Sequence, residues 1–187
     1  MTDDTTRLTR RDALAALAAT GAAGVGLAAI TRDSGTDRAP APDDTVALGA
    51  HERETLTAVA RVVYPEAVDG IAEFVRTYAD GRAETRPERA RAIADAVATL
   101  DERADRAEDA PYVDLLPGRQ ETLLREMGVD VIDPDPEGIV AARLRYYLVN
   151  ELLFALYASP TGGRLVGIEN PQGYPGGIDS YRRGPDG

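Results

Sequence analysis

Residues 137–158 read EGIVAARLRYYLVNELLFALYA, and this stretch decides the fold. Four leucines in it recur at the four-residue spacing of one helix face: Leu144, Leu148, Leu152 and Leu156. Leu153 and Phe154 add apolar side chains beside that face, so most of the surface of such a helix is apolar. A helix of this kind is stable when other elements surround it. The sequence therefore predicts a long last helix at the centre of a bundle.

Further helices are predicted upstream, over residues 51–64, 71–79, 87–106 and 117–127. Each combines an apolar stripe at helical spacing with a start or stop signal. These signals are Pro65 after the first, Asp80 and Gly81 after the second, Pro87 opening the third, and Gly128 after the fourth. No hairpin-linked pair of strands and no internal repeat is evident. The predicted fold class is all-α, a small bundle of about five helices.

Residues 159–187 differ from the helices and are predicted to form an irregular tail. Ser159 and Pro160 end the last helix, and frequent glycine and proline argue against any helix beyond them. The tail still carries apolar side chains, such as Leu165 and Ile178, that a solvated linker does not need. It must therefore lie on a surface, either of its own helices or of another chain.

The composition is strongly acidic, with a formal net charge of -11, and all 21 basic residues are arginine because the chain has no lysine. Such a surface is typical of proteins from salt-loving archaea, because it keeps a protein hydrated where salt screens charges within about 3 Å at 1 M. Nucleic acid is excluded as a partner, since phosphate binding needs clustered positive charge and the arginines here alternate with acids.

Residues needed for common kinds of catalysis are missing. The absence of cysteine excludes disulfides, thiolate metal sites and covalently attached haem. The single histidine, His51, has no evident partner to orient it as a general base and is interpreted as a helix-start residue. Residues 133–138 resemble the start of a calcium loop, but Leu144 stands where that loop needs a bidentate glutamate. No catalytic, cofactor-binding or metal-binding residue is assigned.

The N-terminus resembles a twin-arginine export signal. Arg10 and Arg11, followed by Asp12, precede a charge-free run, Ala13–Thr31, that is rich in alanine and glycine and only weakly apolar. We assign residues 1–31 to this signal and expect an extracytoplasmic protein, secreted or at the membrane face. An uncleaved membrane anchor stays open, because the run is close to the shortest membrane span of about 17 residues. The remaining alternative is an ordinary helix of a cytosolic protein.

Two further segments follow the signal. Residues 32–47 are rich in aspartate and proline, carry few apolar groups and are predicted to be a disordered linker. Residues 48–187 then form the helical domain, with residues 159–187 as its irregular tail.

Several stretches resemble the gluconate 2-dehydrogenase subunit 3 family. They include the helix end at Tyr64 and Pro65, the segment YVDLLPGRQ at residues 112–120, LYASPTGGRLVG at 156–167 and NPQGYP at 170–175. The likeness covers most of residues 1–180 and rests on structural motifs. The connection between the first two predicted helices is shorter here than in many relatives.

This resemblance implies a small helical subunit without activity of its own. It implies a partner, a large flavoprotein of the glucose-methanol-choline (GMC) oxidoreductase type, whose FAD takes hydride equivalents from a sugar or alcohol. No cofactor is then expected in this chain, and a cytochrome or another acceptor removes the electrons. In that arrangement the small subunit supplies the export signal and stabilises the flavoprotein.

Tyrosines with an apolar body and a polar tip suit a protein interface, so we place the partner contact at the last helix and tail. The predicted contact residues are Tyr146, Tyr147, Tyr157, Ser159, Pro160, Gly162, Gly163, Asn170, Pro171 and Tyr174. Simple core packing is an equal alternative for each of the three helix tyrosines. The alternative function is a free-standing exported or membrane-anchored helical domain of the cell envelope.

Overall fold

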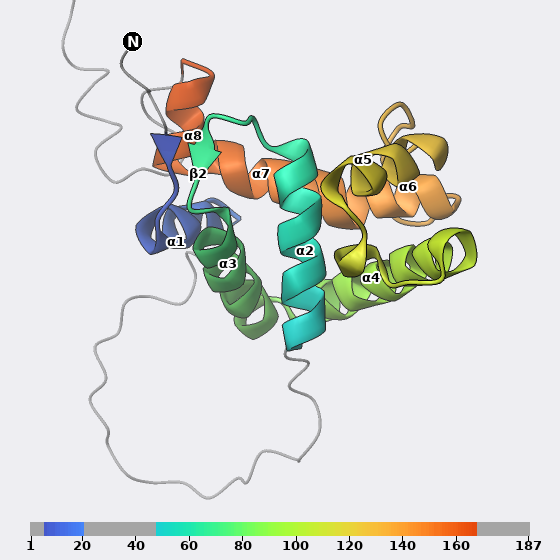
Figure 1. Cartoon of the computed structure of the whole chain (residues 1–187). Coiled ribbons are helices and arrows are strands. Elements are labelled where there is room, and N and C mark those ends of the chain that lie inside the picture. The colour runs from blue at the N-terminus through green and yellow to red at the C-terminus, as the bar shows by residue number, and fades with distance from the viewer. Residues whose placement is uncertain (1–5, 21–47, 168–187) are drawn as a thin grey trace, which may run out of the picture.

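A computed structural model describes residues 6–20 and 48–167, and it confirms an all-α fold. The helices are α1 (Arg10–Ala19), α2 (Ala50–Val63), α3 (Ile71–Thr85), α4 (Pro87–Glu108), α5 (Pro117–Glu126), α6 (Val140–Leu144), α7 (Asn150–Ala158) and α8 (Pro160–Leu165). Two short strands, β1 (Thr6–Arg7) and β2 (Val68–Asp69), pair in parallel. Figure 1 shows α2 crossing in front of the rod that contains α7, with α1 and α3 on one side and α4 to α6 on the other.

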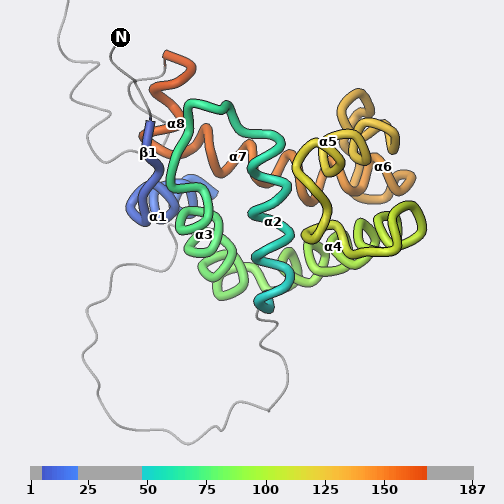
Figure 2. Tube along the Cα trace, in the orientation of Figure 1, coloured from blue at the N-terminus to red at the C-terminus, as the bar shows by residue number. Residues whose placement is uncertain are grey.

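The predicted last helix is confirmed as the central element. A π-helical turn, Arg145–Val149, joins α6 to α7, so the three segments form one rod (Figure 2) that contacts α1, α2, α4 and α8. Leu144, Leu148, Leu152 and Leu156 are all at most 1% exposed, as expected for one buried face. The rod begins at Val140 and not at residue 137, because residues 135–138 form a turn in which the Gly138 amide donates to the Asp135 carbonyl.

The helices α2, α4 and α5 follow their sequence signals closely. Pro65 follows α2, Pro87 opens α4, and Gly128 follows α5 in a left-handed conformation with φ of +74°. The YVDLLPGRQ segment links α4 to α5, since the Tyr112 amide donates to Asp101 and the Gln120 side chain donates to the Tyr112 carbonyl.

The prediction that Asp80 and Gly81 end the second helix is wrong, because α3 continues to Thr85. Gly81 is an interior residue of this helix and lies against Leu17 of α1. A Cβ at position 81 would come within 2.3 Å of the Leu17 Cδ1 atom. The glycine therefore provides close packing between two helices, which local sequence signals do not reveal.

The prediction of no helix after Ser159 is also wrong for residues 160–165, which form α8. Ser159 is the N-cap: its hydroxyl accepts from the Gly162 amide at 3.0 Å and donates to the Leu156 carbonyl at 2.6 Å. A Cβ at Gly162 would lie 2.0 Å from the Leu156 carbonyl oxygen. Glycine is present at this position because α8 packs tightly on the end of α7.

We expect Gly162→Ala to lower the free energy of unfolding by about 1–3 kcal/mol, because a backbone carbonyl blocks the added methyl group. Gly118→Ala in α5 is the matched control, since nothing lies within 4 Å of a Cβ there. Chemical denaturation of both variants measures the difference. Equal stability of the two variants would show that α8 does not pack on α7 in this way.

Residues 6–20 pack on the helical domain, although the sequence places them in a separate export signal. The Thr6 amide donates to the Ala67 carbonyl and the Leu8 amide to the Asp69 carbonyl, each at 2.8 Å, and α1 contacts α3, α7 and α8. This parallel pair of strands was not expected.

The predicted linker 32–47 lies outside the described residues. In the described ranges, no helix has the length and apolar character needed to cross a bilayer.

Candidate functional site

The predicted contact residues fall into three groups in the structure. Tyr146 and Tyr147 lie in the π-helical turn, and Tyr157 lies near the end of α7. Ser159, Pro160, Gly162 and Gly163 form the α7–α8 junction. Asn170, Pro171 and Tyr174 lie outside the described residues.

Tyr146 and Tyr147 are half-buried and held by a contact within the chain. The Arg89 guanidinium lies 4.4 Å from the Tyr146 ring centre and 4.6 Å from that of Tyr147, and the two rings meet edge to face. Such cation–π contacts fix both rings against α4. Much of the ring surface of these two tyrosines is therefore used within the chain.

The α7–α8 junction is covered largely by the same chain. Ser159 is fully buried, and Gly162 and Gly163 are also buried. The Thr161 amide donates to the Asp12 carboxylate of α1 at 2.9 Å, so α1 contacts the side of α8 that the sequence analysis assigned to a partner. Ser159, Gly162 and Gly163 therefore pack within the chain and offer little surface to a partner.

An outward-facing stripe on α7, formed by Asn150, Phe154 and Tyr157, carries exposed aromatic side chains of the predicted region. Phe154 is 44% exposed and Tyr157 is 37% exposed. The positions are four and three residues apart, which puts them on one face of the helix, opposite the buried Leu152. We call this set the α7 stripe. Phe154 was not among the predicted contacts, although its spacing to Tyr157 is a signal for it.

A hollow of about 400 Å³ lies beside the α7 stripe. Its wall combines the end of α1, arginines from α3 and α4, one residue of the π-helical turn, and residues of α7: Ala19, Thr20, Arg82, Arg89, Tyr146, Asn150, Glu151 and Phe154. An exposed aromatic side chain next to a polar hollow gives the surface both an apolar contact and a recess that can receive a side chain.

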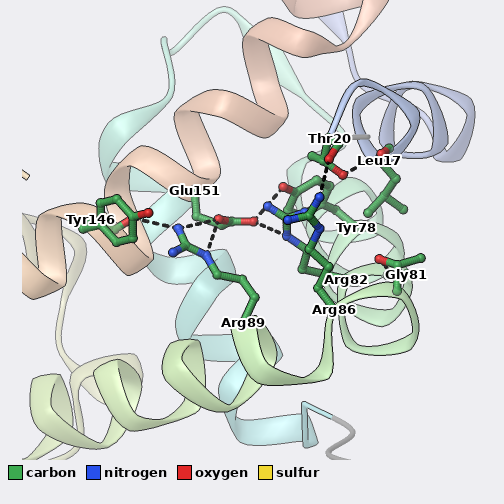
Figure 3. Close-up of polar contacts among 10 residues, drawn as sticks. Leu17, Thr20, Tyr78, Gly81, Arg82, Arg86, Arg89, Tyr146 and Glu151 are labelled. Atoms are coloured by element: carbon green, nitrogen blue, oxygen red, sulfur yellow. Dashed lines mark hydrogen bonds and ion pairs between the residues drawn. The ribbon is translucent and has the colours of Figure 1, made fainter. Parts of the chain in front are cut away.

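Glu151, the only acid in the apolar part of the last helix, lies below this hollow. It is 5% exposed, and its carboxylate accepts from the Tyr78 hydroxyl at 2.8 Å and from Arg82 Nε at 2.6 Å. Its other oxygen accepts from Arg89 Nε at 3.0 Å. Figure 3 shows Glu151 between Arg89 on one side and Arg82 with Tyr78 on the other. We call these four residues the Glu151 cluster.

The surroundings of the Glu151 cluster favour the charged form of its carboxylate. Burial by itself raises the pKa of the Glu151 carboxyl, but the hydrogen bond from Arg82 and the charges of Arg82 and Arg89 lower it below its ordinary value. Burial and the nearby carboxylate raise the pKa of the Tyr78 hydroxyl, so it stays a donor. The cluster ties α3, α4 and α7 together beneath the α7 stripe. Two guanidinium groups facing one carboxylate indicate a structural ion network, since both oxygens of the Glu151 carboxylate accept hydrogen bonds within the cluster.

His51 is part of an ion pair near the surface. His51 Nε2 lies 2.6 Å from Asp101, and the hydrogen bond to this carboxylate raises the pKa of the imidazole. In residues 6–20 and 48–167, no group of three or more His, Cys, Asp or Glu side chains is placed to hold a metal ion.

The family profile described as gluconate 2-dehydrogenase subunit 3 matches residues 50–176. The chain belongs to the gluconate 2-dehydrogenase subunit 3 family. The match spans α2 to α8 and includes the whole α7 stripe. The chain therefore has the accessory role that the family name gives, in association with other dehydrogenase subunits. No curated protein and no solved structure matches the chain.

The family match covers one part of the described chain and leaves out another. The helices α2 to α8 lie within the matched residues, whereas β1 and α1 precede them. Residues 6–20 lie outside the matched residues, and α1 packs on α3, α7 and α8, which lie within them.

Proposed function

We propose that this chain is the non-catalytic small subunit of an exported, membrane-associated, flavin-dependent sugar or alcohol dehydrogenase. It binds a GMC-type flavoprotein subunit and stabilises it. FAD is held by the partner, which passes electrons to a cytochrome or another acceptor. The observation that carries the proposal is the exposed aromatic α7 stripe within the region matched to the family.

The α7 stripe has the character of a docking surface. Protein interfaces are enriched in aromatic residues and depleted of charge at their centre, and a few such side chains supply most of the binding energy. Phe154 is one of only two phenylalanines in the chain and stands 44% exposed on its most apolar helix. The Glu151 cluster below keeps α3, α4 and α7 at fixed positions, so the stripe is presented on a rigid support.

Deleting the gene in its native host tests the stabilising role. We expect the extracytoplasmic dehydrogenase activity and the amount of flavoprotein to fall together, because the unpartnered flavoprotein is degraded or not exported. Re-expression of the full chain restores both. A deletion strain with normal flavoprotein level, location and activity would contradict the proposal.

The export step has its own test. We expect the double change Arg10→Lys and Arg11→Lys to hold the chain and its flavoprotein inside the cell, because twin-arginine recognition depends on the guanidinium pair. Cell fractionation and blotting measure this.

The matched control for export is Arg182→Lys with Arg183→Lys, which makes the same chemical change at another adjacent pair. Normal export of the Arg10 and Arg11 variant would reject the signal. Retention of both double variants would show a general effect of arginine loss.

A further inference from the structure

Apolar residues of the N-terminal segment are buried in the folded domain, and most of them also belong to the run that resembles an export signal. Leu8, Ala13 and Ala16 are each at most 1% exposed, and Leu17 is 6% exposed. Three of these four belong to the charge-free run, Ala13–Thr31, that gives the segment its likeness to an export signal. The same side chains therefore fill the core of the folded domain and form the apolar part of the signal.

Specific polar contacts hold the segment in place as well. Asp12, next to the arginine pair, is 5% exposed, and its carboxylate accepts from the Thr161 amide and from the Thr9 amide and hydroxyl. Burial raises the pKa of this carboxyl, but these hydrogen bonds outweigh it and lower the pKa overall. Asp12 thus fixes α1 to α8 in its charged form.

Contacts near the two ends of α1 also fix it to the helical domain. The Arg10 side chain contacts Glu73 of α3 at 2.6 Å, and the Arg86 guanidinium donates to the Thr20 carbonyl at 2.9 Å. Leu17 fits against Gly81, where no side chain intervenes. The arginine pair itself stays outside, with the Arg10 side chain 69% exposed.

We propose that α3, α7 and α8 form a binding surface for residues 6–20 and that docking there competes with their use as an export signal. This inference rests on the proposed twin-arginine export. In the docked state Arg10 and Arg11 are exposed to solvent, whereas Ala13, Ala16 and Leu17 are buried. A translocase or a bilayer must take up the apolar run, and side chains buried in the core are not available to it.

Two physical states follow, docked and released, and their balance sets how fast the chain leaves the cytoplasm. A translocase that binds only the released state binds the chain in proportion to the fraction of molecules in that state. Weakening the docking surface therefore raises signal availability without any change in the signal itself. Gly81 offers such a change, because it lies on α3 and faces Leu17.

The test is Gly81→Leu in the full-length chain. The added side chain occupies the space of Leu17, whereas leucine is a better helix former than glycine, so α3 itself stays stable. Gly118→Leu is the control, at a helical glycine with nothing within 4 Å of its Cβ. Trypsin cleavage after Arg10 and Arg11 reports release. We expect it to be about tenfold faster in Gly81→Leu than in the parent or the control.

Pulse-chase export of the same variants completes the test. We expect the precursor of Gly81→Leu to be exported faster than the parent precursor, and that of Gly118→Leu at the parental rate. Unchanged cleavage in Gly81→Leu would overturn the docking. Faster cleavage with unchanged export, in cells where the Arg10 and Arg11 lysine variant is retained, would overturn the competition alone. Export of that lysine variant would instead reject the twin-arginine signal.

A second pair of variants tests the docking if Gly81→Leu does not fold. Leu17→Ala and Leu14→Ala remove the same side chain from the charge-free run, but Leu17 is 6% exposed and Leu14 is 60% exposed. Both weaken the signal equally, and only the first weakens docking. We expect faster cleavage after Arg10 and Arg11 in Leu17→Ala alone. Equal cleavage rates in the two variants would contradict the proposal.

Discussion

The Glu151→Ala variant is expected to lose about 3–5 kcal/mol of unfolding free energy, because it leaves buried positive charge without its carboxylate partner. The change leaves Arg82, whose side chain is 9% exposed, without its carboxylate in the interior. Arg89 and the Tyr78 hydroxyl lose the same acceptor. Chemical denaturation at constant high salt measures the loss, because buried pairs are screened far less than surface pairs.

Glu121→Ala is the matched control for this variant. It removes an exposed ion pair with Arg125, four residues along the same helix, and should cost less than about 0.5 kcal/mol. Comparable losses in the two variants would contradict the role of the Glu151 cluster as the link between α3, α4 and α7.

Acid unfolding separates the charge of Glu151 from its shape. Its pKa is lower in the folded chain than in the unfolded chain, so its stabilisation is present above the unfolded value and is lost as pH falls toward the folded value. Glu151→Gln keeps the shape of the side chain but does not titrate. The stability of this variant should therefore depend less on pH in the acid range, and the dependence that remains comes from Asp12 and the other carboxylates.

Replacing Phe154 and Tyr157 together by aspartate is expected to weaken flavoprotein binding at least about a hundredfold. Each central aromatic side chain of an interface is worth about 2 kcal/mol or more, and the new carboxylates are desolvated on binding. Both side chains are exposed, so the isolated chain should keep its stability. Affinity capture of the flavoprotein by each variant measures the effect.

Leu116→Asp with Val131→Asp is the control for this surface. These residues are 78% and 82% exposed and lie outside α7, in the segments that flank α5. We expect flavoprotein capture at the parental level. Loss of capture in this control, with normal capture in the α7 variant, would move the interface away from the α7 stripe.

The sequence predicted those elements whose signals are local. The apolar spacing of the last helix, Pro65, Pro87 and Gly128 each act within a few residues, and the structure confirms the helices that they delimit. The two glycines that were misread, Gly81 and Gly162, are explained by helices that approach closely in space. No local propensity contains that information.

The Glu151 cluster escaped prediction for a similar reason. Glu151 lies 69 residues from Arg82 and 62 residues from Arg89, so only the tertiary fold brings the three charges together. A lone acid in an apolar helix was the available signal, because such a residue needs a buried cation. The docking of residues 6–20 was hidden by their likeness to an export signal, which does not predict packing against the domain.

The most direct test of the partnership is purification of the full chain from its native host at high salt, followed by absorption spectroscopy and identification of the bound proteins. The proposed function predicts a yellow complex in which the chain is bound to a GMC-type flavoprotein that carries FAD. A colourless, stable monomer, recovered from cells that contain that flavoprotein, would contradict it.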